Sequence, residues 1–189
     1  MKKNLYKRML AYAIPLLIVG GMTYKPLTTN LFGEDIVLKT TPLDPRDLFR
    51  GDHVLIDLDI ERVPIRRISN GVQEEITDRG NNGFFMGKEI DVYVRLTPEE
   101  NQYVVSQVVL EKPSSGIYLK GTINPYDIYD EKQDVPIHYN LDRYFVPENT
   151  GMALEEGARE GNALVSLKVK DGYGVIQEVT LDESPRLDR

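Results

Sequence analysis

The sequence contains no cysteine and only two histidines among its 189 residues. Without cysteine the chain has no disulfide, no thiolate metal ligand, no thiol nucleophile and no lipid attachment residue of the bacterial lipoprotein type. Neither His53 nor His138 belongs to an H-E-x-x-H pattern, so the zinc-protease motif is absent. We therefore predict no metal site and no cofactor, and stability that comes from packing.

Basic residues are also fewer than acidic ones, 23 against 30, which gives a net charge of −7. The imbalance is greater beyond residue 25, because residues 1–25 contain five bases and no acid. An acidic surface repels the phosphates of nucleic acids, so we expect no DNA or RNA partner. Hydrophobic and charged contents of 41% and 28% are those of an ordinary globular chain, and the length suits one domain.

The motifs of several enzyme classes are missing as well. The sequence has no P-loop, no G-x-G-x-x-G after an expected strand, and no serine in a G-x-S-x-G elbow. These absences favour a non-enzymatic protein. The alternative is a cell-envelope glycan-binding domain or a carboxylate-dependent hydrolase, in which Asp52 and Glu148 form the acid pair. Aromatic residues could line a sugar groove or pack in the core: Tyr118, Tyr126, Tyr129, Tyr139, Tyr144 and Phe145.

The N-terminal segment has an uncharged apolar stretch at residues 9–24, with Lys7 and Arg8 before it and Lys25 after it. This pattern predicts a single transmembrane helix, and Gly20, Gly21, Met22 and Thr23 near its end make a poor processing site, which favours an uncleaved anchor. The positive-inside rule leaves the N-terminus in the cytoplasm. We expect residues 1–25 to form a cytoplasmic stub and anchor, and residues 26–189 an extracytoplasmic β-rich domain of the cell membrane.

Beyond the anchor, apolar and polar residues alternate in short blocks bounded by turn-forming residues, the period of half-buried strands. Two pairs of blocks should form hairpins, 91–96 with 103–110 and 164–169 with 175–181, the second around Asp171 and Gly172. The expected strands are 36–39, 53–60, 91–96, 103–110, 117–123, 135–141, 164–169 and 175–181.

Two segments break this alternation. Residues 68–85 are rich in glycine, asparagine and aspartate and are predicted to form a long, mobile loop that carries Phe84 and Phe85. A short helix is expected near residue 150, where Asn149 or Thr150 can cap it. The predicted fold is mainly β: one N-terminal transmembrane helix, then an antiparallel β-barrel or sandwich with one short helix.

Two polar clusters are the candidate binding sites. The first is stiffened by Pro42 and Pro45 and leads into the 53–60 strand, and its carboxylates and guanidiniums could pair with one another or leave one member free for a ligand. The second runs from a predicted strand into the short helix, and its acids could staple the helix to the first cluster through ion pairs. The candidate residues are Asp44, Arg46, Asp47, Arg50 and Asp52 in the first, and Arg143, Tyr144, Glu148 and Glu155 in the second.

Both clusters resemble the bacterial proteins named for a GDYXXLXY motif. The first matches a Pro-x-Asp-Pro-Arg turn followed by Arg-Gly-Asp, and residues 143–148 are similar to that family's Arg-Tyr-Phe-Val-Pro-Glu stretch. This chain departs from the GDYXXLXY motif itself: His53, Ile56 and Leu58 stand where the motif has tyrosine, leucine and tyrosine. The resemblance implies a membrane-anchored domain without an established activity, encoded beside polytopic membrane proteins.

These observations lead to one expectation for function. The chain should be a non-enzymatic accessory or scaffold domain, held at the lipid bilayer by its anchor and docked on a membrane or envelope partner. A polytopic membrane protein is the partner that the family resemblance implies.

Overall fold

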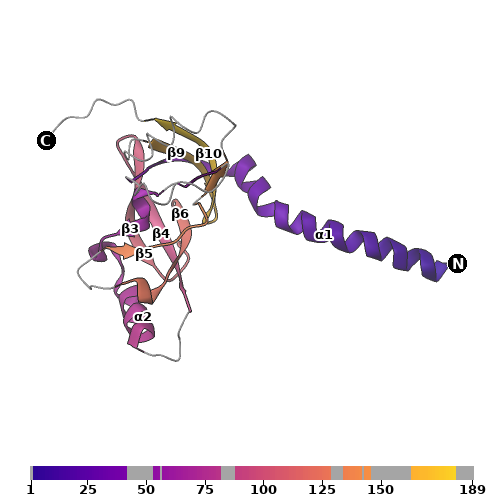
Figure 1. Cartoon of the computed structure of the whole chain (residues 1–189), viewed down its shortest axis with the longest axis horizontal. Coiled ribbons are helices and arrows are strands. Elements are labelled where there is room, and N and C mark those ends of the chain that lie inside the picture. Colours follow the sequence, from indigo (N-terminus) through magenta and orange to yellow (C-terminus); the bar gives the residue numbers. More distant parts are fainter. Residues whose placement is uncertain are drawn as a thin grey trace.

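The structure is a computed structural model, and it describes residues 2–41, 53–55, 57–81, 88–128, 134–141, 143–145 and 163–181. It consists of a β domain and one long N-terminal helix that projects from it (Figure 1). The predicted helix near residue 150 and the pair Phe84 and Phe85 lie outside the described residues.

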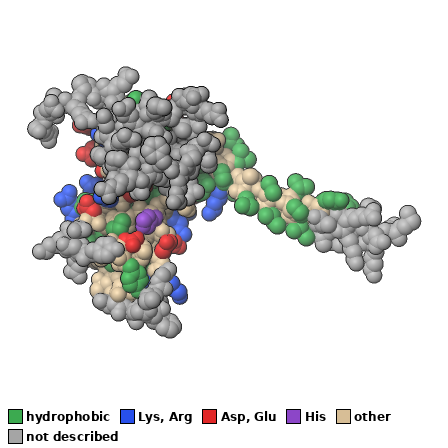
Figure 2. All heavy atoms as spheres, in the orientation of Figure 1, with side chains coloured by type: hydrophobic (Ala, Val, Ile, Leu, Met, Phe, Trp, Pro, Cys, Tyr) green, Lys and Arg blue, Asp and Glu red, His purple; other side chains and the backbone are tan. Residues whose placement is uncertain are grey.

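The projecting helix, α1, comprises Lys2–Phe32 and continues past Lys25, where the predicted anchor ends. It ends where Gly33 N donates a hydrogen bond to Thr29 O at 2.8 Å, and its last turns contact β9 and β10 of the domain. Between its grey N-terminal end and the domain it carries exposed apolar side chains (Figure 2), and Leu16 and Leu17 are 73% and 75% exposed. Over the part of the chain that the structure describes, no helix combines enough length with enough apolar character to cross a membrane.

Two three-stranded antiparallel sheets form the domain. One has the order β1-β9-β10, from strands Glu34–Lys39, Ala163–Lys170 and Tyr173–Leu181. The other has the order β5-β4-β6, from Gln102–Val109, Ile90–Glu99 and Tyr118–Ile123. Two short ladders accompany them: β2 (His53–Leu55) with β8 (Arg143–Phe145), and β3 (Arg62–Val63) with β7 (Val135–Pro136).

A single core lies between these elements. Alternate residues of the strands point into it, such as Ile36 and Leu38 of β1, Val92 and Val94 of β4, and Leu167 of β9, all at most 2% exposed. The domain is therefore mainly β with antiparallel sheets and is consistent with a β-sandwich, as the alternation predicted. At one edge, Lys120 N donates to Gly172 O at 2.8 Å and ties β6 to the β9–β10 turn.

Both predicted hairpins are confirmed. β4 pairs with β5 through a turn at Glu100, which has φ of 53°, and β9 pairs with β10 through Asp171 and Gly172. The φ values of Asp171 and Gly172 are 52° and 81°, and two positive φ angles are the mark of the type I′ turn that matches strand twist.

The predicted long loop at residues 68–85 is wrong over most of its described length, because Asn70–Asn81 form a helix, α2. Val72 and Ile76, four residues apart, face the core, and Val72 is fully buried. Beside them Glu75 and Arg79 form an ion pair at 2.7 Å. This i, i+4 pairing supports the helix although glycine and asparagine lower the intrinsic propensity. The three-residue 3₁₀ turn η3 (Ile65–Arg67) precedes it.

Two predicted strands are shorter than expected. The 53–60 strand is interrupted, and a 3₁₀ turn, η2 (Asp59–Glu61), occupies its end, although Leu58 and Ile60 are buried as predicted. In the 135–141 segment only Val135–Pro136 are strand, although Ile137 N still donates to Glu61 O at 2.8 Å and His138 forms a single bridge with Thr122. Alternate residues of this segment still enter the core, including Ile137 and Tyr139.

Candidate functional site

Most of the predicted binding residues lie outside the described part of the chain. Asp44, Arg46, Asp47, Arg50 and Asp52 of the first cluster do, as do Glu148 and Glu155 of the second. Arg143 and Tyr144 are described through their backbone, in β8. The predicted ion pairs between the clusters, and the acid pair Asp52 and Glu148, stay predictions.

Backbone pairing nevertheless brings together the strands next to the two clusters. Strand β2, which begins directly after Asp52 in the sequence, pairs antiparallel with β8. In this register Val54 faces Tyr144 and Leu55 faces Arg143. The strand that follows the first cluster and the strand that opens the second are thus hydrogen-bonded neighbours, a long-range pairing that the sequence pattern does not reveal.

A comparison of sequences gives this pairing its context. A profile of the GDYXXLXY protein family matches residues 15–179, which is most of the chain. The chain belongs to the GDYXXLXY family. No curated protein and no solved structure matches it significantly. In this GDYXXLXY protein the motif strand is β2, and Leu58, at the last motif position, is fully buried and bridges to Thr40 beside β1. That position therefore serves the core.

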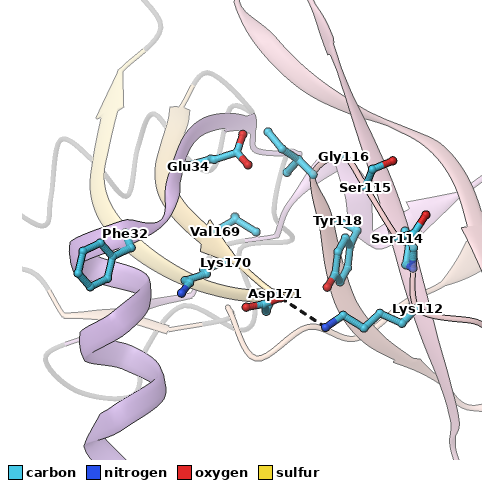
Figure 3. A pocket seen from close by; sticks show the side chains of 12 residues that line it. Phe32, Glu34, Lys112, Ser114, Ser115, Gly116, Tyr118, Val169, Lys170 and Asp171 are labelled. Carbon is cyan, nitrogen blue, oxygen red and sulfur yellow. Dashed lines mark hydrogen bonds and ion pairs between the residues drawn. The ribbon is translucent and has the colours of Figure 1, made fainter.

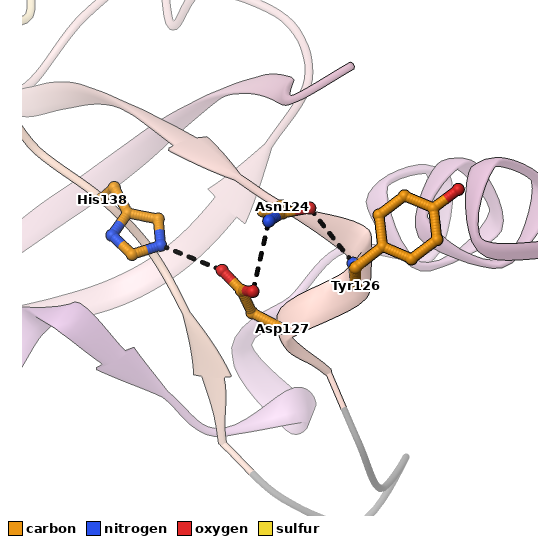
Figure 4. A network of polar contacts seen from close by, with 4 residues as sticks. All are labelled: Asn124, Tyr126, Asp127 and His138. Carbon is orange, nitrogen blue, oxygen red and sulfur yellow. Dashed lines mark hydrogen bonds and ion pairs between the residues drawn. The ribbon is translucent and has the colours of Figure 1, made fainter. Parts of the chain in front are cut away.

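A polar network surrounds His138 on the same domain (Figure 4). His138 Nε2 lies 3.4 Å from Asp127 Oδ2, and Asn124 Nδ2 donates to Asp127 Oδ1 at 3.2 Å. Asn124 also accepts from Tyr126 N at 3.2 Å, which caps the 3₁₀ turn η5 (Pro125–Asp127). The sequence analysis missed Asp127 as the partner of His138, because the two side chains come from different elements.

The network borders a hollow of about 400 Å³ that contains a second ion pair. Lys120 Nζ lies 2.8 Å from Asp91 Oδ2, and this hydrogen bond raises the pKa of Lys120. Lys120 and the imidazole of His138 thus each have a carboxylate neighbour. An imidazole oriented by a carboxylate can accept a proton, but catalysis also needs a nucleophile or a metal. Among the described residues, no group of three or more potential ligands could hold a metal ion.

The aromatic residues divide between packing and surface. Tyr118 and Tyr139 are each only 7% exposed, and Tyr139 Oη donates to Ile60 O at 3.0 Å within the core. Tyr118 packs edge-on against Tyr93, with ring centroids 5.8 Å apart. Tyr126 is exposed, whereas Tyr129 and the side chains of Tyr144 and Phe145 lie outside the described part. The described aromatic side chains therefore act chiefly in packing.

A second hollow, of about 550 Å³, lies where α1 meets the domain (Figure 3). Phe32 and Lys170 lie on its helix side, and Lys170 Nζ is 5.7 Å from the centroid of the Phe32 ring. On the opposite side Lys112 Nζ is 3.4 Å from Asp171 Oδ1 and 6.0 Å from the Tyr118 ring centroid. The side chain of Tyr118, and after it Asp171, raise the pKa of Lys112, which keeps its ammonium charged. We call this hollow the junction hollow.

Proposed function

We propose that the chain is a non-enzymatic accessory domain that α1 tethers to the cell membrane and that docks on a membrane partner. The observation that carries the tether is the exposure of α1: large apolar side chains between Tyr12 and Phe32 are exposed on the helix (Figure 2). Exposing so many large apolar groups to water is costly, and a lipid environment removes that cost.

The length of the apolar stretch sets how the tether sits. Residues 9–24 carry no charge and, as an α-helix, measure about 24 Å, against about 30 Å of hydrocarbon in a typical bilayer. Lys7 and Arg8 before this stretch and Lys25 after it have long side chains that reach the headgroups and compensate for the difference. The base-rich end then faces the cytoplasm and the β domain the outside.

The junction hollow fits this placement. An aromatic ring and two lysines, Phe32 with Lys112 and Lys170, stand at the end of α1 where it meets the domain. A lysine suits a membrane interface, because its apolar stem can lie against lipid while its ammonium stays in water. The hollow would therefore lie at the membrane surface when the helix is inserted.

Flotation of the full chain with phosphatidylcholine vesicles tests the tether. The helix variant combines Leu16→Ser, Leu17→Ser and Ile18→Ser, and the control variant combines Leu110→Ser and Leu181→Ser, two exposed leucines of the β domain. We expect the wild type and the control to float with the vesicles and the helix variant to stay in the soluble fraction. A wild type that does not float, or a helix variant that floats equally well, would overturn the tether.

Docking is tested by co-purification from detergent-solubilised membranes. Asp52→Ala and Arg143→Ala change one residue in each predicted cluster. Asp52 directly precedes β2 in the sequence, and Arg143 is the first residue of β8, the strand that pairs with β2. We expect each change to release a membrane protein that the wild type retains, with the chain itself still in the membrane fraction. Docking would be contradicted if the wild type purifies without any membrane protein, so that it does not differ from the two variants.

A further inference from the structure

Three arginines gather on one hollow of this acid-rich chain without any acid beside them. Arg66 and Arg67 of η3 and Arg95 of β4 line an open hollow of about 550 Å³ that has no aspartate or glutamate in its lining. Hydroxyl groups complete it, from Thr97, Ser106 and Ser115. We call it the arginine hollow.

The positive charge of this hollow is not neutralised within the described part of the chain. There, ion pairs engage none of the three arginines; they join Arg79 with Glu75, Lys112 with Asp171, Lys120 with Asp91, His138 with Asp127 and Lys168 with Asp35. The hollow beside His138 differs in this respect, since its lysine, Lys120, is paired with Asp91. Guanidiniums placed together repel one another, and a bound anion removes that repulsion.

Two features fix the geometry of the hollow. Arg67 Nη1 donates to Val105 O at 2.6 Å, so one guanidinium is held against β5 and its other donors remain available. The β4–β5 ladder also shifts register between Arg95 and Leu96, which makes Ser106 an extra residue in β5. Ser106 Oγ donates to Arg95 O at 3.1 Å at this bulge. Bulges re-aim side chains and are frequent beside binding sites.

We propose that the arginine hollow binds a phosphate group carried by a small organic molecule or a lipid. Guanidiniums bind phosphate oxygens through paired N–H donors, and the hydroxyl groups of Thr97 and Ser115 add further donors. Three positive charges match a phosphate better than a single carboxylate. The volume falls in the range of small-molecule sites, so it holds more than an inorganic ion.

The arginine hollow lies next to the junction hollow at the end of α1. Ser115, Gly116 and Ile117 line both the arginine hollow and the junction hollow at the end of α1. A phosphate bound here comes either from a soluble phosphorylated compound or from a lipid headgroup. The same chemistry serves both sources, and the two arms of the experiment separate them.

The first arm titrates the full chain, in a neutral detergent, with sn-glycerol 3-phosphate and separately with acetate, by calorimetry. Arg66→Gln and Arg95→Gln each remove one guanidinium from the hollow, and Arg62→Gln removes the same charge from an exposed arginine outside it. Arg66 is exposed, so its variant should keep the wild-type urea midpoint. If the ligand is soluble, the wild type binds glycerol 3-phosphate saturably, and each hollow variant binds it about tenfold or more weakly. Arg62→Gln then binds as the wild type does.

The second arm compares flotation with vesicles of phosphatidylcholine and of equal parts phosphatidylcholine and phosphatidylglycerol. If the ligand is a lipid headgroup, the extra binding to the anionic vesicles falls in Arg66→Gln and Arg95→Gln and persists in Arg62→Gln. Binding to phosphatidylcholine alone reports the tether and should be equal in all four proteins. The proposal is overturned if neither arm separates the hollow variants from Arg62→Gln, or if acetate binds as tightly as glycerol 3-phosphate.

Discussion

The phenolic hydroxyl of Tyr139 donates a hydrogen bond to the main-chain carbonyl of Ile60 at 3.0 Å, inside the core of the domain. The bond ties the segment after β7 to the 3₁₀ turn that follows the motif strand β2. Tyr139 is almost completely buried, and the loss of solvation raises the pKa of its hydroxyl well above 10, with a smaller contribution from the charge of Glu61.

The first prediction concerns this hydrogen bond. Tyr139→Phe keeps the ring but leaves the Ile60 carbonyl without its donor, so the free energy of unfolding should fall by about 1 kcal/mol near neutral pH. Urea unfolding followed by circular dichroism measures the change. Tyr126→Phe, at an exposed ring, is the control and should unfold as the wild type does. Equal stability of Tyr139→Phe and wild type would contradict the buried bond.

The raised pKa of Tyr139 gives a second prediction. The folded state holds the phenolic proton more tightly than the unfolded chain, so this stabilisation is complete below the unfolded pKa of about 10 and is lost as the pH rises from there through the folded pKa. Unfolding free energies at a pH of about 9 and about 11 should therefore fall more in the wild type than in Tyr139→Phe. A parallel fall in both proteins would show that Tyr139 ionises freely in the folded state.

A third prediction concerns the β9–β10 turn. Gly172 has φ of 81°, and an added Cβ would lie 2.9 Å from Tyr118 Cε2. Gly116 has nearly the same φ, 83°, but open space around it. Gly116→Ala should therefore lower the unfolding free energy by the backbone strain alone, about 1 to 3 kcal/mol, and Gly172→Ala by more than that. A Gly172→Ala loss no larger than that of Gly116→Ala would rule out the close packing of the turn on Tyr118.

A fourth prediction tests α2. Gly71 lies near the start of the helix with only an ordinary contact at 3.8 Å to Leu110, so alanine fits there. Because alanine favours the helix over glycine, Gly71→Ala should raise the unfolding free energy by roughly 0.5 to 1 kcal/mol. Thermal or urea unfolding gives the value. A destabilised variant would contradict the helix and favour the loop that the composition suggested.

The loop predicted for residues 68–85 was wrong because composition alone does not show how side chains are spaced along a helix. Glycine, asparagine and aspartate in residues 70–81 suggested a loop, and the helix depends on two i, i+4 pairs, Val72 with Ile76 and Glu75 with Arg79. By contrast, the two hairpins could be predicted, because alternating strands flanked short turns whose residues accept positive φ. Turn residues between alternating strands were therefore a more reliable local signal than composition.

Long-range pairings were beyond the sequence pattern. Nothing in residues 34–39 or 163–170 predicts that β1 pairs with β9, and the same holds for β2 with β8. The His138 and Asp127 contact and the arginine hollow arise from such pairings, since their side chains come from separate elements. The two predicted clusters were found by resemblance and charge, and their side-chain contacts stay predictions.

Protease added to cells stripped of their wall tests the central claim, that α1 holds the β domain on the outer side of the membrane. The account predicts that intact stripped cells lose the domain to protease while a cytosolic control protein survives, with the N-terminal end of the chain retained in the membrane. A domain that resists protease until the cells are lysed, or an intact chain recovered free in the cytosol, would contradict it.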